Sequence, residues 1–316
     1  MNRFFTKQCR TIVTTLAAAG VLVAPAMATE PGGNSYAPGA ETNMAGFMSS
    51  EGLAAYLATT RYVADRLKDS SGEDSKALNN YKLKVTTVAF GLSYVHPGLK
   101  WMDANVETRA GFLATSTDLT IGIKIPGPVG NVTKSDSLTE VAYFLFSPVV
   151  LGWHGTAFHQ NAGLEFIQPI VSYDPKQLVH SAQNYLQVAP FYGVTWMPKA
   201  PYYGSAKVRL GFNDINSTSN YRSGNEFTLE YSVGYRASPD VTFGANGYFF
   251  RQISDDVKNN VVVNGDGNRG SVNGLGPFVT YRVSSKVILM AKLMSEFGTI
   301  NRPEGTRLWL QTKIPF

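Results

Sequence analysis

Apolar and polar residues alternate along several stretches of the chain, most clearly in 226–236 and in the last eleven residues, 306–316. Successive side chains of a strand point to opposite faces, so this pattern predicts strands with one apolar and one polar face. The two faces of the final stretch hold Leu308, Leu310, Thr312, Ile314 and Phe316 against Trp309, Gln311 and Lys313. One face suits lipid and the other suits water.

Runs of this kind recur along the chain and predict twelve strands. Two of the runs are irregular: the polar face changes midway through 81–96, and the pattern in 104–117 indicates a bulge. The predicted strands span 52–67, 81–96, 104–117, 138–154, 158–173, 185–196, 206–213, 225–236, 241–253, 273–282, 287–296 and 306–316. An even number of strands returns both ends of the chain to the same side.

The connections between the predicted strands alternate in length. If the first strand runs outward, outer connections such as 118–137 and 254–272 are longer than inner ones such as 155–157 and 237–240. Outer-membrane barrels have this arrangement of long external loops and short periplasmic turns. A closed antiparallel barrel also satisfies every backbone hydrogen-bonding group, as hydrocarbon requires. We therefore predict an all-β fold: a single antiparallel transmembrane β-barrel of the bacterial outer-membrane type, with about 12 strands, over residues 51–316.

The start of the chain has the features of an exported protein. Residues 1–28 combine a basic start, an apolar run over 12–23 and a small-residue end at Ala28, which predicts a cleaved secretory signal. The only cysteine, Cys9, lies inside this signal, so no disulfide is expected. Cleavage leaves 25 basic and 23 acidic residues, a near balance that excludes a nucleic-acid-binding footprint. The predicted location is the outer membrane of a Gram-negative cell.

Residues 29–50 are rich in Gly, Pro and Asn and show no period, so they are predicted to be irregular. Two alternatives remain open: the segment plugs the barrel lumen, or it is a flexible periplasmic tail. Several of its side chains would be poorly accommodated in water, which favours the plug. These candidate plug residues are Tyr36, Met44, Phe47 and Met48.

Charged and amide side chains on the polar faces are predicted to point into the lumen, because a charge facing lipid near the bilayer midplane costs ~2–4 kcal/mol. They either line an aqueous path or pair across strands and fill a narrow interior. The predicted lumen residues are Lys207, Arg209, Glu226, Glu230, Arg236, Lys292, Glu296, Gln311 and Lys313.

Three arginines, Arg222, Arg269 and Arg302, fall in three successive predicted outer loops. One interpretation is a ring of guanidinium groups at the extracellular mouth that binds a carboxylate or phosphate of a solute or of lipopolysaccharide. The alternative is that they order the loops by pairing with nearby acids. The acids available are Glu226, Asp255, Asp256 and Glu304.

Neither a metal site nor a catalytic site is predicted. The histidines, His96, His154, His159 and His180, lack metal-ligand spacing, although His154 and His159 could share an ion. Ser181 follows His180 directly, and neighbours on a strand face opposite ways, so the two do not form a nucleophile and base. We predict no enzymatic activity and no cofactor.

Four segments together resemble the outer-membrane family of the meta-pathway of phenol degradation. They are Ser147-Pro148 with Leu151-Gly152-Trp153-His154, then Asn220-Tyr221-Arg222-Ser223-Gly224-Asn225-Glu226-Phe227, then Gly267-Asn268-Arg269-Gly270, and finally Asn301-Arg302-Pro303-Glu304-Gly305 with Trp309-Leu310 and Pro315-Phe316. The resemblance implies a barrel that accompanies the breakdown of aromatic compounds.

This resemblance makes a passive channel for small hydrophobic or aromatic compounds the expected function. The alternative is a structural or surface-interaction barrel with a closed lumen. The expected partners are outer-membrane lipid and lipopolysaccharide, a small hydrophobic solute, and the barrel-assembly machinery, which in such barrels reads a terminal aromatic such as Phe316.

Overall fold

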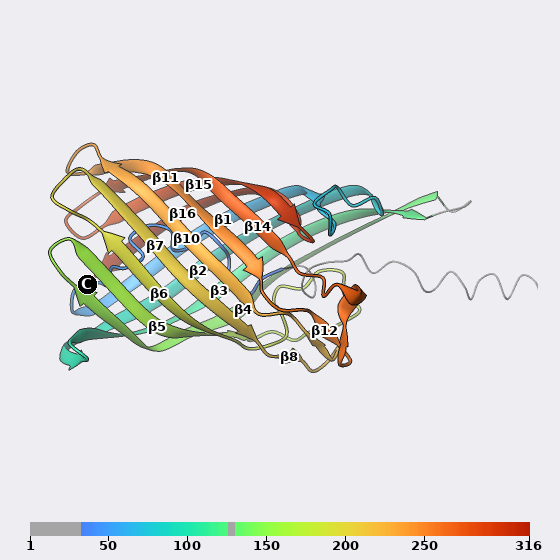
Figure 1. The fold of residues 1–316 in the computed structure, drawn as a ribbon, viewed down its shortest axis with the longest axis horizontal. Helices are drawn as coiled ribbons and strands as arrows, with labels where there is room; N and C mark the ends of the chain where they lie inside the picture. The colour runs from blue at the N-terminus through green and yellow to red at the C-terminus, as the bar shows by residue number, and fades with distance from the viewer. Residues whose placement is uncertain (1–32, 126–129) are drawn as a thin grey trace, which may run out of the picture.

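The protein is a closed barrel of twelve antiparallel strands in a computed structural model that describes residues 33–125 and 130–316 (Figure 1). The predicted signal, residues 1–28, lies outside the described residues. The barrel strands are β1 (Gly52–Leu67), β2 (Leu78–Trp101), β3 (Ala104–Ile125), β4 (Gly130–His154), β5 (Phe158–Pro169), β6 (Gln187–Trp196), β7 (Tyr202–Asn213), β10 (Glu226–Arg236), β11 (Val241–Gln252), β14 (Ser271–Arg282), β15 (Ile288–Ile300) and β16 (Pro303–Pro315). The predicted fold class is confirmed.

Closure of the barrel follows from the pairing of the first and last strands. β1 pairs with β16 from Ala54 opposite Pro315 to Leu67 opposite Pro303. Every other barrel strand pairs with its chain neighbours in the barrel, so no sheet edge is left open to lipid.

The two faces of the strands are inverted relative to those of a water-soluble protein. On β10, Glu230 is 1% exposed whereas Val233 is 63% exposed, and the intervening residues follow the same alternation. On β16, Leu308 and Leu310 are exposed and Trp309 is buried. Apolar side chains therefore cover the outside, where hydrocarbon receives them, and polar side chains fill the inside.

Three neighbouring strands are longer than predicted. β2, β3 and β4 have 24, 22 and 25 residues, and they extend past the rest of the barrel in Figure 1. The predicted outer loop 118–137 is therefore wrong, because Asp118 pairs with Ser137 and Lys124 with Asn131 inside the sheet. In β3 the alternation continues through this extension, with Leu119 and Ile121 buried, whereas residues 131–137 of β4 are mostly polar on both faces. The predicted loop 297–305 likewise shortens to 301–302.

The bulge predicted within 104–117 lies instead on the partner strand β4, although the pairing of the two strands is irregular there. The pairing of β3 with β4 shifts register between Glu107 and Arg109 and again between Leu113 and Ala114. Each shift inserts one residue on β4 and so changes which of its side chains face inward.

Additional short elements lie at the end of the barrel with the longer connections, which is the extracellular end by the usual convention. A small sheet there comprises β8 (Ile215–Asn216), β9 (Tyr221–Arg222), β12 (Val257–Lys258) and β13 (Val261–Val262), followed by the 3-10 turn η1 (Val263–Gly265). Connection 170–186 also turns inward at this end, where Val179 packs with Tyr62 and Tyr81 in a buried cluster. Among the described residues, no helix is long and apolar enough to cross a membrane.

Candidate functional site

The inner segment, residues 33–51, runs through the lumen and is held there by the barrel wall. Glu230 of β10 makes three hydrogen bonds to it. The carboxylate accepts hydrogen bonds from the Tyr36 hydroxyl at 3.0 Å and from the backbone N–H groups of Gly39 and Glu41 at 2.5 and 2.8 Å. Hydrogen bonds to an ionised acceptor are among the stronger ones, so Glu230 fixes the middle of the segment.

Lysines on two other strands complete this attachment. Lys292 Nζ on β15 donates to the carbonyl oxygens of Gly39 at 2.6 Å and Ala40 at 3.0 Å. Lys207 on β7 forms an ion pair and hydrogen bond with the Glu41 carboxylate. The inner segment thus carries charge complementary to the wall.

The end of the inner segment nearer to β1 lies against β5 to β7. Ala45 N donates to Ser205 Oγ at 2.8 Å, and Gly46 N donates to Thr195 Oγ1 at 3.0 Å. A Cβ atom at Gly193 would lie 2.4 Å from the Ala45 carbonyl oxygen, so glycine is required at this approach. The Phe47 ring stacks on His159, with ring centroids 3.9 Å apart.

All four candidate plug residues lie in this segment, Tyr36 and Met48 buried and Met44 and Phe47 half-buried. The predicted lumen residues fall into two groups. Lys207, Arg209, Glu226, Glu230 and Lys292 are buried, whereas Arg236, Glu296, Gln311 and Lys313 are partly exposed.

Most of the predicted lumen residues have partners within the wall or the inner segment. Arg209 Nη2 lies 3.0 Å from Glu165 Oε1. Glu226 accepts a hydrogen bond from Gln187 at 3.0 Å. Glu296 accepts hydrogen bonds from Tyr62 and Tyr248 at 2.7 and 2.6 Å. These contacts show paired polar groups filling the space beside the segment.

The three arginines proposed for the mouth occupy different environments. Arg302 is buried, and its guanidinium carbon lies 4.6 Å from the centre of the Phe250 ring. Arg269 binds Asp255 with a 2.7 Å contact, which is the loop-ordering alternative, and Arg222 is exposed on β9. The structure therefore does not bring the three guanidinium groups into one anion site.

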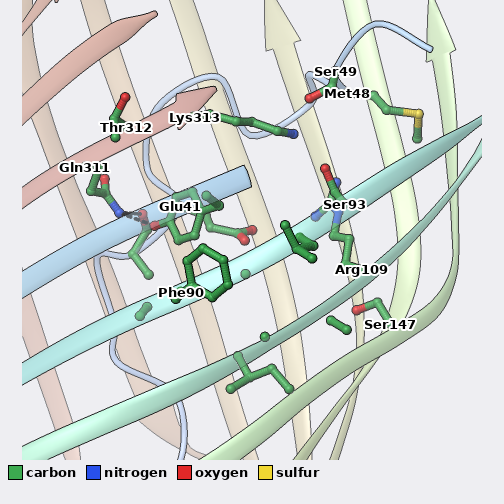
Figure 2. Close-up of a pocket in the computed structure, with 18 of the residues that line it drawn as sticks. Glu41, Met48, Ser49, Phe90, Ser93, Arg109, Ser147, Gln311, Thr312 and Lys313 are labelled. Carbon is green, nitrogen blue, oxygen red and sulfur yellow. Dashed lines mark hydrogen bonds between the residues drawn. The ribbon is translucent and has the colours of Figure 1, made fainter. Parts of the chain in front are cut away.

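A cavity of about 440 Å³ lies between the inner segment and the wall formed by β1 to β4, β15 and β16. Met44, Phe47 and Met48 line it from the segment, and Tyr56, Ala89 and Leu113 are among the wall residues. Figure 2 shows Glu41, Arg109 and Lys313 reaching towards this space from the segment, β3 and β16. Its lining extends to Lys286, in the turn before β15, and so reaches the periplasmic half of the barrel.

Sequence reasoning missed Glu107, Arg109 and Glu165, three charged residues on the strands beside this cavity. Arg109 donates through Nε and Nη2 to Glu107 Oε2, at 2.9 and 2.7 Å. Lys313 Nζ lies 3.6 Å from the other oxygen of Glu107, and Glu165 lines the cavity while paired with Arg209. Glu107 and Arg109 are two residues apart in a predicted strand, so the rule that strand charges face the lumen would have found them.

The histidines lie at the edges of the site. His154 and His159 are cross-strand partners whose Nδ1 atoms are 3.3 Å apart, and His180 stacks on Tyr173. Among residues 33–125 and 130–316, no group of three or more His, Cys, Asp or Glu side chains could hold a metal ion.

Solved structures with a similar fold are outer-membrane barrels. The COG4313 outer membrane channel from Pseudomonas putida F1 is 11% identical, covers 89% of this chain and 100% of its own, and has a TM-score of 0.64. The CymD monoaromatic hydrocarbon channel is 8% identical, covers 86% of this chain and 90% of its own, and has a TM-score of 0.43. At these identities the first likeness establishes the fold, and the second is too distant to add to it.

The family model described as "Putative MetA-pathway of phenol degradation" matches residues 64–312, which include the whole barrel except part of β1 and the last residues of β16. No curated protein matches the sequence. The chain belongs to this phenol-degradation family of outer-membrane β-barrels.

Proposed function

We propose that this barrel is a passive outer-membrane channel for small aromatic or otherwise apolar compounds. The observation that carries the proposal is the cavity beside the inner segment. Its volume of about 440 Å³ and its lining of apolar side chains with a few charged groups are typical of small-molecule sites. A passive channel needs no nucleotide site or energy source.

The family and the fold point in the same direction. The family description concerns phenol degradation, and the P. putida protein of similar fold is an outer-membrane channel. A cell that degrades aromatic compounds must first take them across its outer membrane. Solutes would then move past the inner segment on their way to the periplasm.

The test is flux through the purified, folded protein in liposomes, with benzyl alcohol as a neutral aromatic solute. We expect benzyl alcohol to enter protein-containing liposomes faster than liposomes with heat-inactivated protein. Equal rates, together with an absence of pore current in planar bilayers, would exclude a channel.

A second candidate is a structural or surface-interaction barrel with a closed lumen. The observation that favours it is the inner segment, which is bonded to β6, β7, β10 and β15 within the lumen. The same flux experiment separates the two candidates, because a permanently filled lumen passes no solute.

A further inference from the structure

The charges around the cavity are unevenly balanced. Two acids line it, Glu41 and Glu165, and each is paired with a cation that is itself buried in the wall, Lys207 and Arg209 respectively. These two pairs contribute no net charge. They also place no unpaired carboxylate in the cavity.

The opposite arrangement holds at Glu107. This carboxylate is 0% exposed and does not line the cavity, yet two cations that do line it, Arg109 and Lys313, share it. Two cations against one acid leave one positive charge at this end of the cavity. Lys286 also lines the cavity and adds a second positive charge.

Both cations keep capacity to bind another anion. Arg109 uses two of its three nitrogens on a single oxygen of Glu107, and its side chain is 25% exposed. Lys313 Nζ lies 3.6 Å from Glu107, beyond ordinary hydrogen-bond distance, and its side chain is 37% exposed. Figure 2 shows the two side chains pointing toward each other at one end of the cavity, from β3 and β16.

The rest of the cavity is suited to an aromatic ring. Phe47, Met44 and Met48 line it, and methionine sulfur makes favourable contacts with rings. An apolar cavity of about 150 Å³ can hold benzene, so about 440 Å³ leaves room for a ring with substituents.

We infer that this cavity binds aromatic carboxylates, with the ring beside Met44, Phe47 and Met48 and the carboxylate between Arg109 and Lys313. The inference rests on the proposed channel function and narrows its substrate class. Phenols have a pKa near 10 and are neutral in the periplasm, whereas aromatic carboxylic acids are ionised there. The site therefore favours the acid over the phenol or alcohol of the same size.

The test compares benzoate with benzyl alcohol by calorimetry and by liposome flux, using the mature protein. We expect benzoate to bind more tightly than benzyl alcohol. Lys313→Gln should weaken benzoate binding about ten-fold, the scale of one lost charge-assisted hydrogen bond, and leave benzyl alcohol binding unchanged. Lys82→Gln is the matched control, because Lys82 is exposed on β2 outside the lining of the cavity.

Arg109→Gln should have the same effect as Lys313→Gln. If Arg109→Gln alone does not fold, the double variant Glu107→Gln/Arg109→Gln removes both members of the buried pair. Equal affinity for benzoate and benzyl alcohol, or wild-type benzoate affinity in folded Lys313→Gln, would overturn the inference. Flux of benzyl alcohol without preference for benzoate would overturn it and leave the channel function standing. Absence of flux for both solutes would overturn both.

Discussion

Two parts of the barrel wall differ in how they contact the inner segment. The wall of β6, β7 and β10 contacts it directly, through Thr195, Ser205, Lys207, Glu230 and other polar groups. The wall of β1 to β3 instead leaves a cavity of about 440 Å³ between itself and the segment. One wall therefore fixes the segment in place, and the other provides the space in which a solute can bind.

The difference comes from what each wall presents to the lumen. On β7 and β10 the inward positions hold long charged side chains, of which Lys207 reaches the Glu41 carboxylate and Glu230 reaches the backbone of the segment. On β2 and β3 the cavity is lined by Ala89, Gly91 and Gly111, which are too small to reach it. A filled lumen can thus keep a pocket without an open pore, because short side chains on one wall are enough to create it.

Deletion of residues 33–50 should change the properties of the channel most, because it removes nearly all of the inner segment from the lumen. The lumen then fills with water, and we expect single-channel conductance in planar bilayers to rise several-fold. Lys207, Glu230 and Lys292 become hydrated in this variant, so the barrel should still fold. A folded deletion variant with wild-type conductance would show that the segment does not close the lumen.

Glu230→Gln should loosen the segment from the wall that holds it. The change removes a charge that accepts three hydrogen bonds from the segment, and we expect a loss of about 2–4 kcal/mol in the free energy that holds it. Hydrogen exchange of the amides in 36–46 should accelerate accordingly. Glu226→Gln is the matched control, because Glu226 faces the lumen on the same strand but bonds to Gln187. Equal acceleration in both variants would contradict a specific role for Glu230.

Ala89→Phe should fill the cavity on the other wall. We expect benzyl alcohol flux to fall several-fold while exchange in 36–46 stays unchanged, since the contacts to β7 and β10 remain. Val88→Phe is the control: the neighbouring side chain is exposed to lipid and should alter neither measurement. An unchanged flux in Ala89→Phe would mean that solutes do not use this cavity.

The smallest expected effect is a pH dependence of the stability of the extracellular loops, which lie away from both walls. Burial raises the pKa of Asp256 to about 6 from its ordinary value near 3.8, although Tyr221, Gly224 and Gln252 donate hydrogen bonds to it. The folded loops therefore hold this proton more tightly than opened loops. Their stability is greatest at low pH and falls as the pH rises through about 6.

Local opening around Asp256 should accordingly be about ten-fold more frequent at pH 7 than at pH 5. Hydrogen exchange of residues 215–225 and 256–268, corrected for the intrinsic pH dependence of exchange, measures it. Asp256→Asn should remove the difference between the two pH values. A difference that persists in this variant would assign the pH dependence to another group.

The number of strands and the direction of their faces could be predicted from the sequence, because lipid and water impose an alternation that is local to each strand. Lys207 and Arg209 were found for this reason. The extension of β3 and β4 was not, because residues 131–137 of β4 are mostly polar on both faces, although the alternation of β3 continues through Leu119, Ile121 and Ile123. Glu41 was missed because its segment has no period and its partner, Lys207, lies 166 residues away.

Attachment of the inner segment to β15 and β16 links its position to closure of the barrel. Lys292 and Gln311 bind the carbonyl oxygen of Ala40, and both lie in the hairpin of β15 and β16. The segment directly precedes β1, the strand that β16 must meet to close the ring. The same hairpin therefore supplies both the strand pairing that completes the ring and two of the hydrogen bonds that hold the segment inside it.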